Sequence, residues 1–194
     1  MKKIISFIMI AAVLLSALFA VSCKAKESDP DIPSGMKLAS DPKLTDYSLF
    51  VPEGWIVDLQ TAATVARASE TDSSSVSVSA FTNASIPESE DILSKYWETY
   101  ESDLINIFDK NDKGESTYKL SGEPVSLAVK RGDKVVPAIK YTYTGTMGGN
   151  ELFFVQMITY RNGYFYIMTL TTTAKGAESH KDAFDSIISN FRLD

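Results

Sequence analysis

The feature that most constrains the fold is a pair of apolar segments, LFFVQMI and YFYIMTL, joined by the turn RNGY (Arg161–Tyr164). An Asn-Gly pair between two such segments is a strong signal for a β-hairpin. Successive residues are apolar in both segments, so each strand is expected to bury both of its faces. Such strands lie in the middle of a sheet between two layers. The sequence therefore predicts a hairpin at the centre of a layered domain.

Neighbouring segments extend this hairpin into a larger sheet. AIKYTYT alternates, with Ile139, Tyr141 and Tyr143 on one face, and Val76–Thr82 alternates in the same way. The whole region from 115 to 173 is expected to be a run of antiparallel strands with short turns. Shorter strands are predicted before it, at Tyr47–Val51, Trp55–Asp58 and Thr64–Ser69.

Two segments have helical periodicity. Ser89–Lys110 has an apolar residue every fourth position, and Ala177–Asn190 carries Phe184, Ile187 and Ile188 at helical spacing. Strands, a helix, a run of strands and a final helix are the order of an α+β protein. We therefore expect an α/β/α sandwich with a central, mostly antiparallel sheet, a long mid-chain helix and a C-terminal helix.

The N-terminus is typical of an export signal. Lys2 and Lys3 precede an almost wholly apolar stretch, Ile4–Val21, which ends in small residues before Cys23. The junction FAVSC resembles the lipobox of bacterial lipoproteins, in which the cysteine after the cleavage site carries diacylglycerol. Ala20 departs from that pattern, which favours leucine at this position. Residues 1–22 are thus expected to be a lipoprotein signal peptide.

Two other interpretations of this N-terminus stay open. Ala20–Ser22 also fits an ordinary small-x-small cleavage site, and the apolar run is long enough to remain as a membrane helix. Lipidation is preferred because Cys23 is the only cysteine and lies where acylation requires it. All three interpretations place the rest of the chain outside the cytoplasm, on the cell envelope.

Charge and composition exclude some partners. Removal of residues 1–22 takes away two lysines and no acids, so the net charge falls from −6 to −8. Such an acidic chain lacks the excess of Lys and Arg that nucleic acid requires. Membrane attachment is therefore assigned to the lipid on Cys23. Residues 23–46 are polar and proline-containing, and are expected to be a flexible tether before a globular domain at 47–194. A short edge strand at Met36–Ala39 within this segment stays open.

The domain resembles the PsbP-like family. The resemblance rests on FVPEGW near its start and on the ending YFYIMTLTTTAKGAESHKDAFDSIISNFRL, and covers roughly Tyr47 to Leu193. It implies an α/β/α fold and a scaffolding or binding role rather than catalysis. No family ligand residue maps onto this sequence. Phe50 and Trp55 flank the turn that Pro52 and Gly54 permit, so Trp55 is expected to fill the core rather than to contact a ligand.

Motifs for catalysis and metal binding are weak. His180 is the only histidine and is expected to be a solvated surface residue. Ser116–Lys119 matches Ser-x-x-Lys, but no Lys-Thr-Gly partner exists. Asp109–Glu115 imitates half of a calcium loop, yet Lys113 occupies a ligand position, so a turn is expected instead. One histidine and no thiol beyond the lipidated one also disfavour zinc. We expect no enzyme activity, no metal and no cofactor.

Aromatic residues are the remaining candidates for a site. Most are expected in the core, but a groove lined by Trp97, Tyr141, Tyr143 and Tyr166 would mark a binding surface. The leading hypothesis is a non-catalytic envelope lipoprotein that serves as an accessory, protein-binding module. The alternative is a small-molecule or glycan binder associated with a transporter, which requires an aromatic pocket. An enzyme that uses only a carboxylate pair is a third and weaker possibility.

Overall fold

The predicted hairpin lies at the centre of the fold. The computed structural model, which describes residues 31–59, 65–83, 85–86 and 89–194, pairs β10 (Asn150–Arg161) with β11 (Tyr164–Thr173). Arg161 lies opposite Tyr164, and Asn162 and Gly163 between them have φ values of 50° and 85°. Positive φ at both positions is the signature of a type I′ turn. The hairpin prediction is confirmed.

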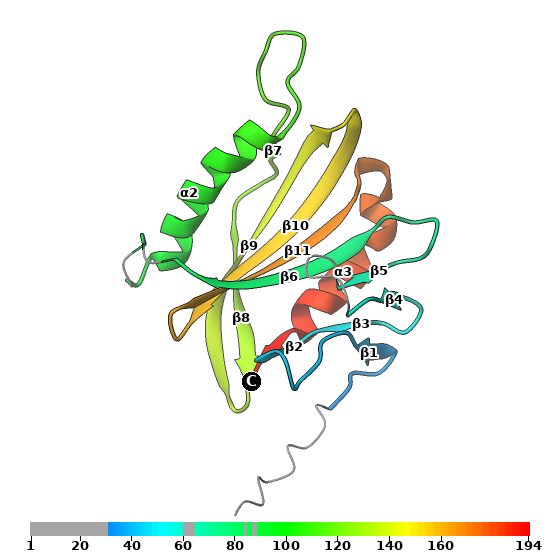
Figure 1. Ribbon diagram of the computed structural model, residues 1–194, viewed down its shortest axis with the longest axis vertical. Coiled ribbons are helices and arrows are strands. Elements are labelled where there is room, and N and C mark those ends of the chain that lie inside the picture. The colour runs from blue at the N-terminus through cyan, green and yellow to red at the C-terminus, as the bar shows by residue number, and fades with distance from the viewer. Residues whose placement is uncertain (1–30, 60–64, 84, 87–88) are drawn as a thin grey trace, which may run out of the picture. The chain divides into compact units, whose positions relative to one another are not determined.

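Strands on both sides extend the hairpin into a mixed, curled sheet (Figure 1). Along the described chain the strand order is β2-β12-β8-β9-β10-β11-β6-β5-β4, with β7 also paired to β9. Every pair is antiparallel except β12 with β8. The remaining bounds are β2 (Tyr47–Ser48), β4 (Ile56–Val57), β5 (Ala66–Arg67), β6 (Ser75–Thr82), β7 (Lys119–Leu120), β8 (Val125–Arg131), β9 (Lys134–Met147) and β12 (Arg192–Leu193).

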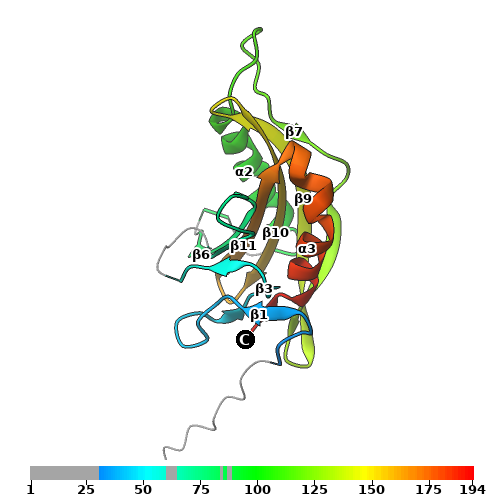
Figure 2. The ribbon, with the colours of Figure 1, turned by 90° about the vertical axis from the view of Figure 1, so that its right-hand side faces the viewer.

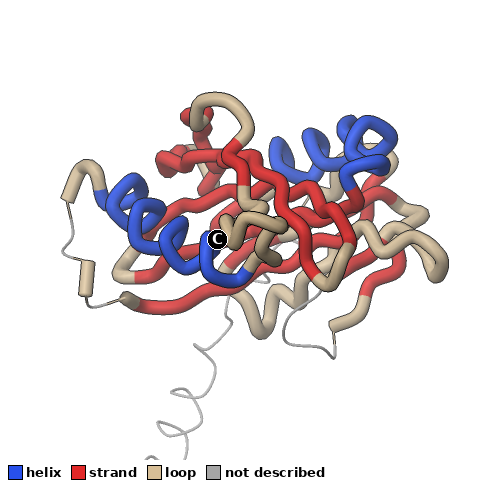
Figure 3. The backbone as a smooth tube through the Cα atoms, turned by 90° about the horizontal axis from the view of Figure 1, so that it is seen from above, coloured by secondary structure: helices blue, strands red, loops and turns tan. Residues whose placement is uncertain are grey.

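A helix covers each face of the sheet. Phe154 and Ile158 of β10 belong to one apolar cluster with α2 (Ile92–Ile107), while Val155 and Met157 belong to another with α3 (Ala177–Asn190). Neighbouring residues of a strand point to opposite faces, so the two helices lie on opposite sides of β10. Figures 2 and 3 show the strands between them. The fold is α+β, with two helices on a curled sheet.

The helix predictions differ in accuracy. The C-terminal helix has the predicted bounds, follows the short 3₁₀ turn η1 (Ala174–Gly176), and buries Phe184, Ile187 and Ile188. The mid-chain helix is shorter than the predicted Ser89–Lys110. It ends at Ile107, because Phe108 adopts extended backbone and its ring lies over Gly145 of β9. A Cβ on Gly145 would be 2.4 Å from that ring, so glycine makes room for it.

The folded unit begins earlier than the predicted boundary at Tyr47. It extends from Ile32 to Asp194. Within it, β1 (Met36–Leu38) pairs with β3 (Phe50–Pro52) as a separate two-stranded sheet. Ala39 is fully buried and Ser40 donates a hydrogen bond to the Tyr47 carbonyl. The short edge strand considered for Met36–Ala39 is therefore present as β1, and it lies within the segment predicted to be a tether.

The N-terminal predictions concern a different part of the chain. The signal peptide, Cys23 and the tether up to residue 30 lie outside the described residues. No helix in the described part of the chain is long and apolar enough to cross a membrane.

Candidate binding groove

The aromatic residues that were predicted to line an exposed groove are buried. Trp97 stacks on Tyr141 with ring centroids 3.7 Å apart and an interplanar angle of 7°, and Tyr143 lies beside both in the cluster under α2. The exposed fractions are 5% for Trp97, 3% for Tyr141 and 1% for Tyr143. Burial raises the pKa of Tyr141 to about 12, with a smaller contribution from Glu101. These rings form the core of one sheet face.

Tyr166 lies on the opposite face from the other three. It is 2% exposed, and its hydroxyl donates a hydrogen bond to a carboxylate oxygen of Asp46. Burial raises the pKa of Tyr166, and the hydrogen bond with Asp46 raises it further. The four aromatics therefore do not line one groove. Trp97 lies on the buried side of α2 and the three tyrosines point from their strands into the two apolar clusters, so these aromatic side chains serve as packing.

His180 also differs from its prediction. Its Nε2 lies 2.7 Å from Oδ2 of Asp72, and its ring lies against Trp55 and Phe184 at centroid distances of 6.4 and 6.0 Å. The side chain is 17% exposed, so it is not a solvated histidine. Asp72 lies in the loop before β6, far away in sequence, and no local pattern marks the contact. Trp55 is buried against Phe184, in agreement with the predicted structural role.

Asp72 is also held by its own loop. Its Oδ1 accepts a hydrogen bond from the backbone N–H of Ser74, at 2.9 Å. The pKa of Asp72 is lowered, first by the hydrogen bonds from Ser74 and then by His180. The Ser74 hydroxyl is 2.7 Å from that of Thr172, not aimed at His180. These contacts pin the loop to α3 and do not build a serine nucleophile.

The other motifs are structural. Asn111 caps a turn, with its Oδ1 accepting hydrogen bonds from the backbone N–H groups of Lys113 and Glu115. Asp109 accepts a hydrogen bond from the N–H of Gly149. The turn predicted for Asp109–Glu115 is therefore present. No three His, Cys, Asp or Glu residues among those described lie close enough to hold a metal ion.

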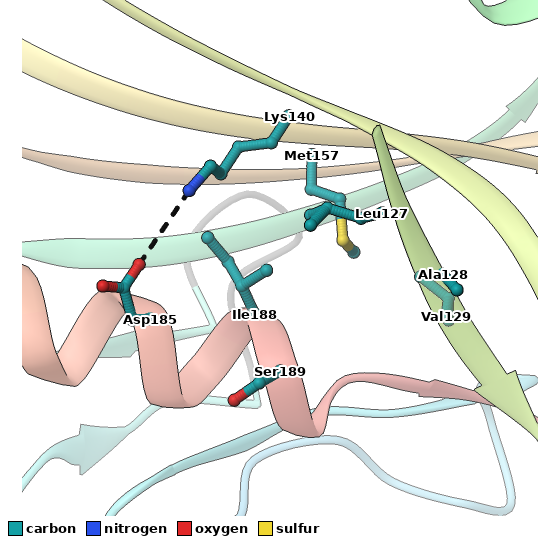
Figure 4. A pocket seen from close by; sticks show the side chains of 8 residues that line it. All are labelled: Leu127, Ala128, Val129, Lys140, Met157, Asp185, Ile188 and Ser189. Atoms are coloured by element: carbon teal, nitrogen blue, oxygen red, sulfur yellow. Dashed lines mark ion pairs between the residues drawn. The ribbon is translucent and has the colours of Figure 1, made fainter. Parts of the chain in front are cut away.

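A groove of about 370 Å³ lies between α3 and the strands β8 and β9 (Figure 4). Apolar side chains make its base: Leu127 and Val129 from β8, Met157 from β10 and Ile188 from α3. Figure 4 shows α3 as one wall and β8 as the other. The groove exists because α3 packs on the middle of the sheet and leaves β8 partly uncovered.

One charged pair borders this groove. Lys140 Nζ of β9 and Asp185 Oδ1 of α3 are 4.0 Å apart, with side chains 24% and 55% exposed. Such a loose, half-exposed pair contributes little stability. It faces the groove with one positive and one negative group, and Asp185 is the one carboxylate among the described residues that line the groove. A glycosidase needs two, and this groove does not supply the second.

A second hollow of about 190 Å³ lies near the N-terminal segment. Ala39, Leu44, Tyr47, Val65 and Val78 contribute to its lining. Among the described residues, Tyr47 is the one aromatic side chain in its lining, and the larger groove is lined by none. Neither hollow is the aromatic pocket that the small-molecule hypothesis requires.

Comparison with solved structures identifies the architecture. No family model and no curated protein matches the sequence. Cyanobacterial PsbP (CyanoP) from Synechocystis sp. PCC 6803 matches with a TM-score of 0.53 and 18% identity, over 86% of this chain and 96% of that one. The chain has a PsbP-like fold. The resemblance in the opening FVPEGW and in the C-terminal ending is confirmed at the level of fold.

Two further structures are similar at lower scores. One is PA94 of Pseudomonas aeruginosa, described as a protein of unknown function and putative regulator, with a TM-score of 0.49, 16% identity, and coverage of 80% and 94%. The other is LpqN of Mycobacterium tuberculosis, described as involved in cell envelope biogenesis, with a TM-score of 0.46, 12% identity, and coverage of 86% and 87%.

Proposed function

We propose that the protein is a non-catalytic lipoprotein of the bacterial cell envelope whose PsbP-like domain binds another envelope protein. The observation that carries this proposal is the form of the groove between α3 and β8. It has an apolar base, one loose ion pair and no convergent set of catalytic side chains. Grooves of this kind suit the side chains of a polypeptide.

The layered arrangement supports a scaffolding role. We infer that the domain is an α/β/α sandwich, with α2 and α3 as outer layers on the sheet. Both central strands are covered on their two faces, and the aromatic residues are packed against one another. A rigid domain of this kind presents its edges and grooves without rearrangement.

The anchor is the part of the proposal that the sequence supports. Cys23 follows an export-like apolar stretch and is the only cysteine. Two variants test it: Cys23→Ser, and Ser22→Ala as a control that keeps the thiol. We expect the first to leave the membrane fraction and lose a diacylglycerol mass on its N-terminal peptide. Unchanged membrane association and mass in Cys23→Ser would rule out lipidation.

The binding role is tested by crosslinking in intact cells. The full chain, tagged at its C-terminus and expressed at native level, should be crosslinked to one envelope protein at near-stoichiometric yield. The matched control is a lipoprotein with the same residues 1–46 fused to an unrelated domain. If both capture the same proteins, or the full chain captures none above background, the binding role is wrong.

The volume of the groove favours one alternative, a small-molecule or glycan binder that serves a transporter. About 370 Å³ is within the range of ligand pockets. Under this alternative, native mass spectrometry of protein purified from its own envelope should reveal a bound molecule. Leu127→Trp, which fills the groove from its half-buried position on β8, should remove that mass while the protein stays folded. A mass of the protein alone in both samples contradicts this alternative.

A further inference from the structure

The outer side of β8 is paired with another strand only at one end. Along its inner side β8 pairs with β9 from Val125 to Arg131. On its outer side it meets β12 at a single position, where Lys130 lies opposite Arg192. From Val125 to Val129 no other described strand lies beside it. Ser126 and Ala128, within this stretch, are exposed.

The register fixes which backbone groups face outward. β8 and β9 are joined by the two-residue turn Gly132–Asp133, which closes on Arg131 and Lys134. Two-residue hairpins close on a hydrogen-bonded pair, and the pairs then alternate along the ladder. Odd-numbered residues of β8 therefore direct their N–H and C=O groups to β9. Even-numbered residues direct theirs outward, in agreement with the bridge of Lys130 to β12.

The apolar groove runs along the same edge. Side chains of odd-numbered β8 residues lie on the α3 face, where Leu127 and Val129 form part of the groove base. Val125, next in this row, is 45% exposed. Unpaired backbone groups and an apolar depression therefore lie side by side. This is the arrangement with which sheet edges bind extended peptides: the backbone pairs, and alternate side chains enter a pocket.

The charged side chains at this edge are mostly basic, whereas the chain as a whole is acidic. Lys130, Arg131 and Lys134 surround the hairpin end of β8, with Asp133 as the one acidic residue of its turn, and Lys140, loosely paired with Asp185, lies opposite Val125 at the other end. Within the described part of the chain, the first three have no carboxylate within ion-pair distance. The protein as a whole has a net charge of −6. A basic edge on an acidic protein attracts an acidic partner.

We propose that β8 binds an extended acidic segment of a partner protein, which adds a strand to the sheet and inserts an apolar side chain into the groove. This proposal rests on the protein-binding role proposed above and names its site and partner class. The segment has an apolar residue over Leu127 and an acidic residue two positions away on each side, toward Lys140 and toward Arg131. A second copy of this chain is a poor occupant, because two basic edges would meet.

The test uses a peptide with this pattern, Thr-Glu-Thr-Val-Thr-Glu-Thr, whose sequence reads the same in both directions. Titrated into ¹⁵N-labelled domain, it should shift the amide signals of Ser126 and Ala128 and slow their hydrogen exchange. A peptide with lysine in place of both glutamates should bind at least about tenfold more weakly. Lysines at a sheet edge can also serve only to prevent unwanted pairing. Equal binding of the two peptides would mean that the basic residues beside β8 do not select an acidic partner, and would overturn the proposal.

Ala128→Pro is the matched edge variant. Proline removes the outward N–H at this position and leaves the ladder to β9 in place. It should weaken binding of the acidic peptide at least about tenfold. Ala128→Val, which keeps the N–H, should bind as the parent does. Unchanged binding in a folded Ala128→Pro variant overturns the proposal, and if that variant does not fold, exchange at Ser126 in the parent decides.

The same variants separate this proposal from the binding role as a whole. In the crosslinking experiment, Ala128→Pro should lose the envelope partner that Ala128→Val retains. If both capture the partner, binding occurs elsewhere and only the edge proposal is wrong. If slow exchange at Ser126 and Ala128 depends on protein concentration without peptide, the occupant is a second copy, and the acidic-segment proposal is wrong.

Discussion

The two faces of the sheet are filled by different kinds of side chain. Under α2 the cluster is mostly aromatic, and Trp97 on Tyr141 and Tyr143 on Phe154 are stacked at 3.7 and 4.9 Å. Under α3 the central strands contribute mostly aliphatic residues and methionine, such as Met157. Both described hollows are lined from the α3 side. The stacked rings fill the space under α2, whereas the two described hollows lie on the α3 side.

The largest effect is expected from removing the stacked ring at the centre of the aromatic face. Trp97→Ala should lower the free energy of unfolding by about 3–5 kcal/mol, because a large buried side chain leaves a cavity. Urea denaturation measures this change. Ile107→Ala, on the same helix but 56% exposed, should change it by less than about 0.5 kcal/mol. Similar losses in both variants would contradict the account of the aromatic face as core.

A second change tests how closely that face is packed. Gly145→Ala places a Cβ 2.4 Å from the Phe108 ring. Displacement of the ring should cost about 1–3 kcal/mol of unfolding free energy, as overpacking usually does. Gly54→Ala is the control, since a Cβ there meets nothing within 4 Å. Thermal denaturation of the two variants side by side should separate them; equal melting temperatures would mean that the ring moves freely.

On the α3 face, replacing Asp72 is expected to have a smaller effect on stability, and that effect should depend on pH. Because the pKa of Asp72 is lowered from 3.8 in the folded state, its carboxylate stabilises the protein above that value, and the stabilisation is lost as pH falls. Asp72→Asn should therefore lower stability near pH 7 by less than about 1 kcal/mol, since the side chain is partly exposed. The difference from the parent should vanish below the folded-state pKa. A difference that grows on acidification would contradict this sign.

The smallest effect on stability is expected at the groove. Lys140→Met breaks the loose pair with Asp185, and the free energy of unfolding should change by less than about 0.5 kcal/mol. The same variant should bind the acidic peptide more weakly, because one end of the edge loses its charge. Ile105→Met, an exposed change on the opposite face, should alter neither quantity. A large loss of stability in Lys140→Met would mean that the groove is structural.

Sequence patterns predicted the parts of the fold whose contacts join residues close together in the sequence. Asn162-Gly163 and the apolar runs beside it identified the central hairpin, and helical spacing gave the C-terminal helix. The edge strand at Met36–Leu38 has too few residues to show a period, and its pairing partner lies beyond the next loop. The need for glycine at position 145 could not be predicted from the sequence. Its contact with the Phe108 ring depends on the path of the chain after α2.

The candidate site could not be predicted from local sequence patterns, because its contacts join residues that are far apart in the sequence. Trp97 and Tyr141 have the composition of a binding surface, but burial on a sheet covered on both faces decides their role. The groove joins α3 to β8, which are separated by three strands in the sequence. His180 meets Asp72, and Tyr166 meets Asp46, over more than a hundred residues. Such contacts arise only when the sheet is assembled.

The pairing of β12 has a consequence for synthesis. Its two residues, Arg192 and Leu193, pair with Ser48 and Tyr47 of β2, and Arg192 also meets Lys130 of β8. β2 joins the sheet only through this final strand. β2 therefore cannot join the sheet until the chain has been made as far as Leu193. A chain that lacks Arg192 and Leu193 would leave β2 without its partner strand and this edge of the sheet open to proteases.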